Sequence, residues 1–217
     1  MTENHREQAS PDAPVDLLRH IHVEDRSDAS SVILHVPHAG QFIPDELRAS
    51  FVVAEPAILA ELNALTDAAT DRIAGAASTA SIVRSGLSRL VVDVERFPDE
   101  TEEMNAVGMG VLYTHGSRRQ EIRRPTDRDR SVVAEYLHAY ASRFADLVDR
   151  VLARHGSATI IDVHSFPTAA LPYELHGELR RPELCIGTDP DHTPRSLVRM
   201  VRDAFAGLER PRRGVRT

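Results

Sequence analysis

Apolar residues along this chain follow two patterns that alternate with each other. Short apolar runs rich in β-branched residues predict buried strands at residues 31–36, 79–86, 88–99, 157–166 and 182–189. Between these runs, apolar residues at helical spacing predict helices over residues 56–78, 127–156 and 194–208. Strands that alternate with helices indicate an α/β domain in three layers, with a mostly parallel or mixed central sheet and helices on both faces.

The chain divides by composition into three parts. Residues 1–30 are polar and are expected to form a flexible leader, with a short helix near residues 15–21. Residues 31–208 carry the alternating pattern and form the predicted domain. Residues 209–217 are rich in arginine and lack apolar periodicity, so we expect a tail there.

Composition and charge narrow the possible partners. The net charge of −7 argues against nucleic acid or an anionic membrane as the main partner. No apolar run approaches the roughly 20 residues that a membrane span needs, and the N-terminus lacks the apolar core of a secretory signal. The single Cys185 excludes an internal disulfide, so we expect a cytoplasmic protein. All 26 basic residues are arginines, so any bound anion must be held by arginine.

Polar side chains gather where three of the predicted strands end. Because the carboxyl ends of parallel strands meet at one edge of a sheet, where α/β proteins bind their ligands, we expect these side chains to lie together. They are His35 and His38 after the first strand, Arg89, Asp93, Glu95 and Arg96 on the third, and Asp162 and His164 on the fourth.

His38 lies on a short loop between Pro37 and Gly40. A stiff loop holds an imidazole at a fixed angle, as a metal ligand requires. His38 could instead cap the strand or bond a backbone carbonyl. His35 lies within the strand and is expected to support the site rather than to bind the metal.

His164 is the second candidate ligand, and Asp162 precedes it by two residues. Because side chains alternate along a strand, both point to the same face. A carboxylate beside a ligating histidine can orient its ring. Asp67 and Asp71, spaced four residues apart on a predicted helix, could supply a third ligand or could simply form a solvated helix face.

Arginine side chains offer a way to hold a carboxylate on the substrate. The guanidinium groups of Arg89 and Arg96 match a carboxylate in a bidentate manner. Arg89 could instead form a structural ion pair with Asp93, four residues further on.

Taken together and in order, these segments resemble the N-formylglutamate amidohydrolases. The resemblance covers roughly residues 32–208 and is carried by "HVPHAGQFIPDEL", "LTDAATDRI", "SRLVVDVERFPDE" and "IIDVHSFP" followed by "PELCIGTD". It implies an α/β fold related to the zinc carboxypeptidases. It also implies zinc-dependent hydrolysis of N-formyl-L-glutamate to formate and glutamate.

The resemblance assigns roles to individual residues. His38 and His164 match histidines that look like zinc ligands, and Asp67, ahead of Asp71, matches the acid that completes the site. Arg96 matches the arginine expected to hold a small-molecule carboxylate substrate, and Arg89 matches a second basic position.

The sequence departs from the family pattern at two places. Glu95 stands where the family has an asparagine beside the arginine. The segment expected after the last helix, which carries the family's general base, has no counterpart beyond residue 208, so we expect a C-terminally truncated domain in which Glu174 serves as a substitute base. The alternative is a catalytically inactive homologue that retains metal or carboxylate binding.

Overall fold

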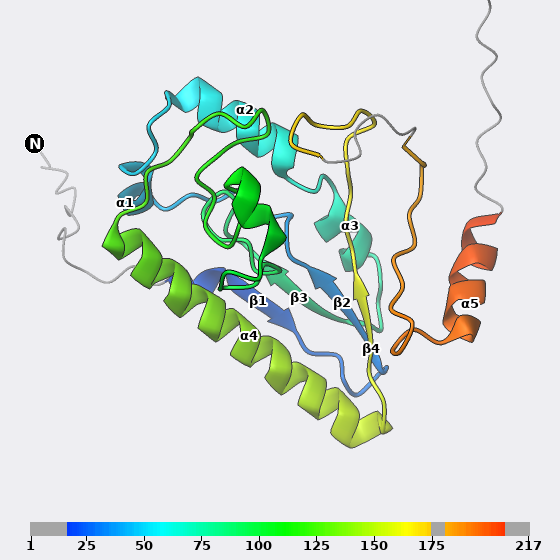
Figure 1. The fold of residues 1–217 in the computed structure, drawn as a ribbon. Helices are drawn as coiled ribbons and strands as arrows, with labels where there is room; N and C mark the ends of the chain where they lie inside the picture. Colours follow the sequence, from blue (N-terminus) through cyan, green and yellow to red (C-terminus); the bar gives the residue numbers. More distant parts are fainter. Residues whose placement is uncertain (1–16, 175–180, 207–217) are drawn as a thin grey trace, which may run out of the picture. The chain divides into compact units, whose positions relative to one another are not determined.

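The computed structural model describes residues 17–174 and 181–206 of the chain. It divides into two compact units, Met1–Gly177 and Glu178–Thr217. The first unit contains the whole sheet (Figure 1). In the second, the described residues form one helix, α5 (Arg195–Ala206), after an irregular segment in which the strand predicted at 182–189 does not form. The predicted tail at residues 209–217 lies outside the described residues.

Four strands form one open, mixed sheet in the order β1-β3-β2-β4 (Figure 1). The strands are β1 (Ile21–Glu24), β2 (Val32–Val36), β3 (Ser81–Ser85) and β4 (Thr159–Asp162). β2 runs parallel to both β3 and β4, whereas β1 is antiparallel to β3. The predicted α/β class with a mixed sheet is therefore confirmed.

Helices cover both faces of the sheet, as predicted. His35 on β2 points toward α4 (Asp127–His155), where its ring contacts Tyr140 and Phe144. Its neighbour Val36 points to the opposite face and packs with Ala74 of α3 (Thr70–Gly75). Because side chains alternate along a strand, α4 and α3 lie on opposite sides of the sheet (Figure 1).

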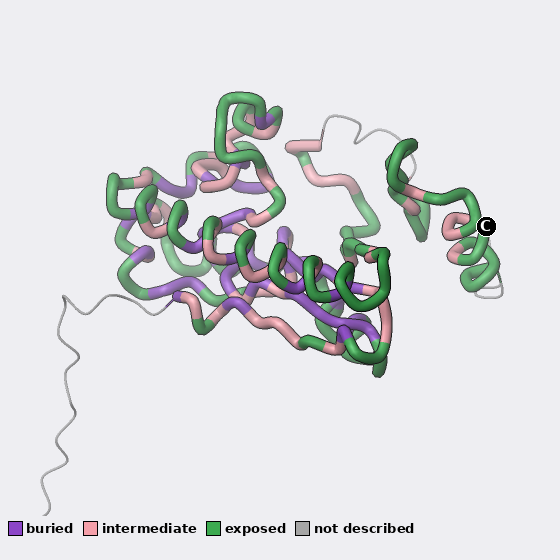
Figure 2. Tube along the Cα trace, turned by 90° about the horizontal axis from the view of Figure 1, so that it is seen from below, coloured by how far each residue is buried: buried purple, intermediate pink, exposed green. Residues whose placement is uncertain are grey.

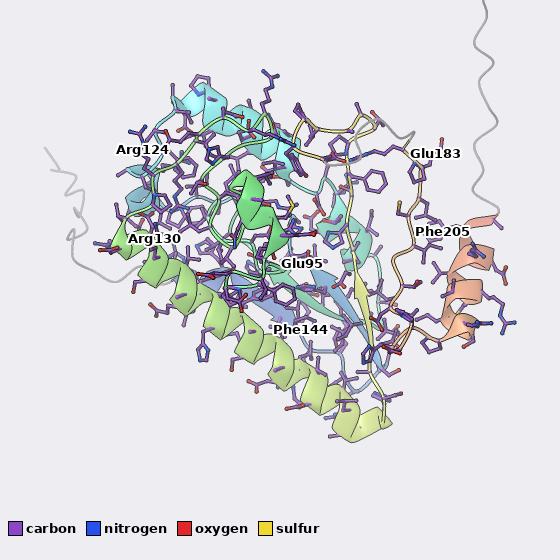
Figure 3. The ribbon with its side chains drawn as sticks, in the orientation of Figure 1. Glu95, Arg124, Arg130, Phe144, Glu183 and Phe205 are labelled. Atoms are coloured by element: carbon purple, nitrogen blue, oxygen red, sulfur yellow. The ribbon has the colours of Figure 1, made fainter. Side chains whose placement is uncertain are left out.

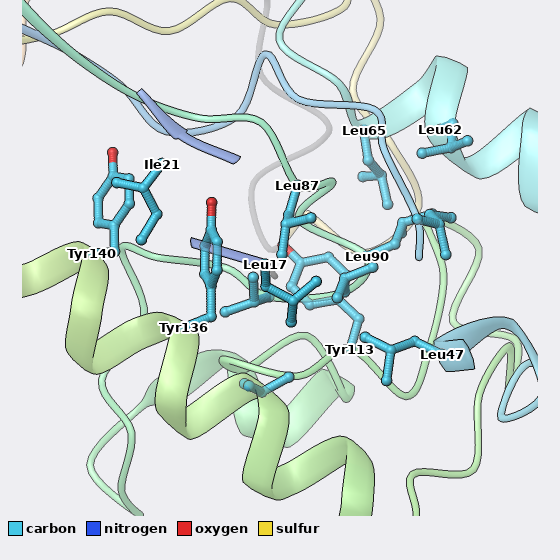
Figure 4. Packing of buried hydrophobic residues seen from close by; sticks show 14 of the residues in the cluster. Leu17, Ile21, Leu47, Leu62, Leu65, Leu87, Leu90, Tyr113, Tyr136 and Tyr140 are labelled. Carbon is cyan, nitrogen blue, oxygen red and sulfur yellow. The ribbon is translucent and has the colours of Figure 1, made fainter. Parts of the chain in front are cut away.

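The long helix α4 supplies much of the core on its face of the sheet. Its apolar buried residues recur at helical spacing: Val133, Tyr136, Tyr140, Leu147 and Val151. Figure 4 shows the two tyrosines beside Leu17 and Ile21, and Figure 2 shows that the outer face of α4 is exposed. Within the parts of the chain that the structure describes, no helix combines the length and apolar character needed to cross a membrane.

The predicted leader is wrong for residues 17–24. These residues form the 3-10 helix η1 (Leu17–His20) and strand β1, which pairs with β3 along its whole length. Of the short helix predicted near residues 15–21, residues 17–20 form this single turn and Ile21 begins β1, while residues 15 and 16 lie outside the described residues. The reason is tertiary: Ile21 is buried in the core, and the His20 carbonyl accepts hydrogen bonds from Gly86 N and Tyr136 Oη.

The strand predicted at residues 88–99 is also wrong. Leu90, Val91 and Val92 are buried as their apolar character suggested, but the segment folds into turns. Two of its backbone carbonyls accept hydrogen bonds from a side chain: the guanidinium of Arg123 donates to Leu90 O and Val91 O at 3.3 Å each. A buried backbone can be satisfied in this way without a neighbouring strand.

Two further predictions need correction. The helix predicted at 56–78 is broken into α2 (Glu55–Leu65) and α3, with Ala69 in a left-handed conformation at φ 65° between them. The strand predicted at 157–166 is shortened to β4 and is not buried, because it lies at the sheet edge with Ile160 and Ile161 exposed. The other helical turns are α1 (Asp45–Arg48) and η2 (Glu103–Val107).

A buried ion pair fixes the start of α4. Thr126 and Asp129 form a capping box, in which each side chain accepts a hydrogen bond from the backbone of the other. Asp129 also accepts from the fully buried guanidinium of Arg123 and from the hydroxyl of Ser50. The carboxylate of Asp129 therefore links the start of α4 to Ser50 and, through Arg123, to the turns at residues 90 and 91.

Removing this carboxylate should destabilise the fold strongly. We expect Asp129→Ala to lower the free energy of unfolding by about 3–5 kcal/mol, because Arg123 would remain charged and unpaired in the core. Asp127→Ala removes an exposed carboxylate from the same helical turn and should cost at most about 1 kcal/mol. Urea denaturation of both variants near neutral pH measures the difference, and equal effects would contradict the assignment.

The same carboxylate should also make stability depend on acid. Burial by itself raises the pKa of Asp129, but hydrogen bonds from Thr126, then from Arg123 and Ser50, outweigh it and hold the pKa at about 2. Since this lies below the unfolded value of about 3.9, the contribution of Asp129 is complete above about pH 4 and is lost as the pH falls toward 2. The stability gap between the native chain and Asp129→Asn should narrow over that window in urea denaturation, and a constant gap would argue against it.

Candidate metal and carboxylate site

The two candidate histidines meet at one edge of the sheet. His38 follows the end of β2 and His164 follows the end of β4, and these strands are parallel neighbours. Their ring centroids are 5.3 Å apart. The sequence expectation that polar strand ends would come together therefore holds for this pair.

The loop that carries His38 packs tightly against the segment after β3. A Cβ atom at Gly40 would lie 2.4 Å from Leu87 O and 2.6 Å from Gly86 O, so only glycine allows this approach. On its other side, the loop is fixed by a hydrogen bond from Asp67 N to His38 O at 3.0 Å. The position of the imidazole is thus set by backbone contacts.

The His38 ring is buried and held in one tautomer by Asp93. Its Nε2 lies 2.9 Å from Asp93 Oδ1. Burial raises the pKa of Asp93, but the hydrogen bond to His38 and the charges of Arg89 and Arg96 more than offset this, so the pKa lies well below its usual range. An ionised carboxylate only accepts hydrogen bonds, so Nε2 must donate. His38 Nδ1 is buried and has no hydrogen-bond partner in the described part of the chain.

Asp67 lies where the predicted long helix is broken, and this break brings it into the site. It is buried between α2 and α3, with Oδ2 2.9 Å from His164 Nδ1 and 3.9 Å from His38 Nδ1. Asp71 lies on the first turn of α3 and is exposed. The expectation that both acids share one helix face is therefore wrong, because only Asp71 is helical.

His164 is more exposed than His38 and is strongly polarised by acids. The hydrogen bond to Asp67, followed by the interaction with Glu95, raises the pKa of His164 to about 10. Asp67, and not Asp162, therefore orients this ring. Asp162 instead hydrogen-bonds His35, with Oδ1 2.7 Å from Nδ1, which corrects the pairing expected from the sequence.

Glu95 lies in the middle of the site. The sequence placed it among the polar strand-end residues and as a departure from the family pattern, without a role as a ligand. Its carboxylate oxygens are 3.4 Å from His164 Nε2, 3.5 Å from His38 Nε2 and 3.6 Å from His35 Nδ1. Figure 3 labels Glu95 close to Phe144, whose ring packs against His35.

Among the described residues, two groups of three bring one ligand atom each within 4.8 Å of one another, and Glu95 belongs to both. The two groups are His38 with Glu95 and His164, and His35 with Glu95 and Asp162. The signal in the sequence was the position of Glu95, two residues after Asp93 on the same polar segment.

Arg89 and Arg96 differ in burial and in the number of hydrogen bonds that they form with the protein. Arg89 is largely buried and donates to Asp93 Oδ2 at 2.8 Å and to Tyr113 Oη at 3.0 Å, which is the structural ion pair considered as its alternative role. Arg96 is 26% exposed and lies 3.5 Å from Asp93 and 3.7 Å from Glu102. Its Nε has no hydrogen-bond partner in the described ranges. Tyr113, which also donates to Asp93, was missed by sequence reasoning because it is a core residue by pattern.

Glu174, the base expected from the sequence, takes part in a local turn. Its carboxylate accepts a hydrogen bond from Leu171 N at 2.7 Å, and its own N donates to Leu171 O at 3.0 Å. Its assignment as general base stays a prediction.

The chain is similar to one known protein family over most of its length. The family model described as N-formylglutamate amidohydrolase matches residues 30–215. No curated protein matches the chain. The crystal structure of N-formylglutamate amidohydrolase from Ralstonia eutropha JMP134 superposes with a TM-score of 0.70 at 17% identity, covering 87% of this chain and 73% of that one.

A second solved structure is more distant. The gene product Atu2144 from Agrobacterium tumefaciens gives a TM-score of 0.54 at 19% identity. The alignment covers 73% of this chain and 59% of that one. At these identities, both structures support the fold alone.

The close approach at Gly40 generates a prediction about the site loop. Gly40→Ala should lower the free energy of unfolding by about 1–3 kcal/mol, because the added methyl group meets backbone atoms that cannot move freely. Gly75→Ala is a matched control, since a Cβ there meets nothing within 4 Å and should stabilise the end of α3 by up to about 1 kcal/mol. Thermal and urea unfolding measure both, and a neutral Gly40→Ala would contradict the packing described for this loop.

Proposed function

Because the chain belongs to the N-formylglutamate amidohydrolase family, we propose that it hydrolyses the amide bond of a small N-formyl amino acid such as N-formylglutamate. The observation that carries the proposal is the state of His38. A buried imidazole has one nitrogen fixed as a donor to Asp93 and the other directed toward Asp67 without a hydrogen-bond partner. This is the arrangement of a metal-ligating histidine backed by a carboxylate.

The types of donor present suit a zinc ion. His38 and His164, each through Nδ1, together with Asp67 would hold it, and two histidines with one carboxylate are a known set for catalytic zinc. Zinc, when bound, polarises a carbonyl and lowers the pKa of a coordinated water to about 7. Because the pKa of His164 is raised to about 10, both of its ring nitrogens are protonated at neutral pH. The proton on Nδ1 would have to leave as the metal binds.

Glu95 forms the more compact group with His38 and His164, but Asp67 is the better ligand because of the nitrogens it faces. It approaches the two histidines on their Nε2 side. On that side His38 already donates its proton to Asp93, so Nε2 has no free lone pair for a metal. Asp67 faces the Nδ1 side of both rings, where His38 has no other partner.

Arg96 would hold the carboxylate of the substrate, with Arg89 in a supporting role. Arg96 is the more exposed of the two. Its Nε is buried 3.5 Å from Asp93, so the terminal nitrogens of its guanidinium would bind the substrate. Arg89 is committed to Asp93 and Tyr113, so it would orient the site. Glu174 remains the base that we expect to take the proton from water. The chain would act in the cytoplasm, where the exposed thiol of Cys185 stays reduced.

One observation favours a second candidate function. The carboxylate of Glu174 is used in a hydrogen bond to its own turn, and hydrolysis requires a base within reach of the attacking water. A homologue that binds a metal ion or a carboxylate without turnover would have the same metal ligands and no base.

Formate release from N-formyl-L-glutamate tests the proposal. The zinc-loaded chain should release formate, and chelation or His38→Ala should reduce the rate by roughly two orders of magnitude or more, because several kcal/mol of transition-state stabilisation are lost. His138→Ala, which removes an exposed histidine from α4, should leave the rate unchanged. Activity that survives chelation would exclude the metal mechanism, and zinc binding without formate release would favour the second candidate.

Arg96→Gln should separate binding from chemistry. We expect KM for N-formyl amino acids to rise about 10- to 100-fold with a smaller effect on kcat, since one charge-assisted hydrogen bond contributes about 1.5–3 kcal/mol. Arg72→Gln, at an exposed position on α3, is the control. An N-formyl amine without a carboxylate should be insensitive to Arg96→Gln, and equal sensitivity of both substrates would contradict the assignment.

A further inference from the structure

His35, Glu95 and Asp162 form a second group of potential ligands beside the first. Each contributes one ligand atom, and these atoms lie within 4.8 Å of one another. We propose that these three residues bind a second divalent cation. This goes beyond the proposed function, which requires one ion held by His38, Asp67 and His164.

The sheet itself brings two of these ligands together. His35 on β2 is the register partner of Asp162 on the adjacent parallel strand β4. Their side chains meet with His35 Nδ1 2.7 Å from Asp162 Oδ1, and the same nitrogen lies 3.6 Å from Glu95 Oε1. Ligands carried on neighbouring strands are held more precisely than ligands on loops.

Packing fixes the direction in which His35 can bind. Its side chain is 7% exposed, and its ring lies against Phe144 and Tyr140 with centroid distances of 4.7 and 5.8 Å. Nε2 is buried without a hydrogen-bond partner among the residues described. Nδ1 is therefore the nitrogen that the fold presents to the two carboxylates. Without an ion it donates its proton to Asp162, and an ion bound between them would replace that proton.

The charges around this group favour a cation. Both arginines of the site are directed at Asp93, at 2.8 Å for Arg89 and 3.5 Å for Arg96. The ion pairs that Glu95 and Asp162 form in the described part of the chain are with histidine rings. Two carboxylates in one partly buried group are costly unless a positive charge lies between them.

The group is also accessible and chemically suited to an ion. The side chain of Asp162 is 54% exposed and that of Glu95 is 25% exposed, so an ion can enter from solvent while His35 stays buried. One imidazole nitrogen with two carboxylate oxygens suits Zn²⁺ or Mn²⁺. Glu95 Oε1 also lies 3.4 Å from His164 Nε2, which puts this group next to the first metal set.

Counting bound metal tests the proposal. The full chain, stripped by chelation, is dialysed against Zn²⁺ alone and analysed by mass spectrometry of the metal, with Mn²⁺ as a second probe. We expect about two ions per chain, as in two-metal hydrolases. Asp162→Asn and His38→Ala should each lower the count by about one, and the double variant should bind almost none.

Controls keep a folding defect apart from a lost ligand. Asp149→Asn removes an exposed acid from α4 and should leave the count unchanged. The metal-free thermal unfolding of Asp162→Asn should stay close to that of the native chain, because this side chain is half exposed. Bound Mn²⁺ should show the spin coupling of two neighbouring ions in electron paramagnetic resonance, and Asp162→Asn should abolish it.

The outcomes are separable from those of the proposed function. A native chain that binds one ion, with Asp162→Asn equal to it, would overturn the second site and leave formate release untouched. Two ions in Asp162→Asn would overturn it as well. If formate is not released although the native chain binds two ions and Asp162→Asn binds one, the proposed function fails and the second site stands.

Discussion

The buried carboxylate of Asp93 is the interaction on which the rest of the site depends. It accepts hydrogen bonds from His38, Arg89 and Tyr113, and its low pKa keeps it ionised. Because an ionised acceptor dictates which nitrogen of His38 carries the proton, one charge in the core decides the chemistry available at the other end of the ring. The same charge holds Arg89 in the core, which leaves Arg96 as the more available cation.

The architecture and the family could be predicted from the sequence because they depend on local patterns. The apolar runs of β2 and β3 and the periodicity of α4 were sufficient to identify an α/β domain. The ordered motifs gave the family that the match over residues 30–215 supports. The pairing of His38 with His164 followed from one rule, that parallel strands end at the same edge of a sheet.

The remaining features depend on contacts between distant parts of the chain, which a local pattern does not encode. Residues 88–99 have the apolar character of a strand, but the Arg123 side chain satisfies their carbonyls. Asp67 was assigned to a helix, whereas α2 ends at Leu65 and Asp67 lies in the break before the left-handed Ala69, with its carboxylate on His164. Glu95 was recognised as unusual, but its place among three histidines depends on how the turn segment packs against the sheet.

The edge position of β4 has a consequence for the dynamics of the site. His38 is attached to β2 in the centre of the sheet, whereas His164 follows a strand whose Ile160 and Ile161 are exposed. Exposed edge strands are among the segments that open locally at a lower free energy than the whole fold. The two halves of the site therefore differ in the free energy of local opening. When β4 frays, His164 and Asp162 would move away together while His38 and Asp93 stay in place. Any ligand that contacts both halves would therefore stabilise the pairing of β4 with β2 at the edge of the sheet.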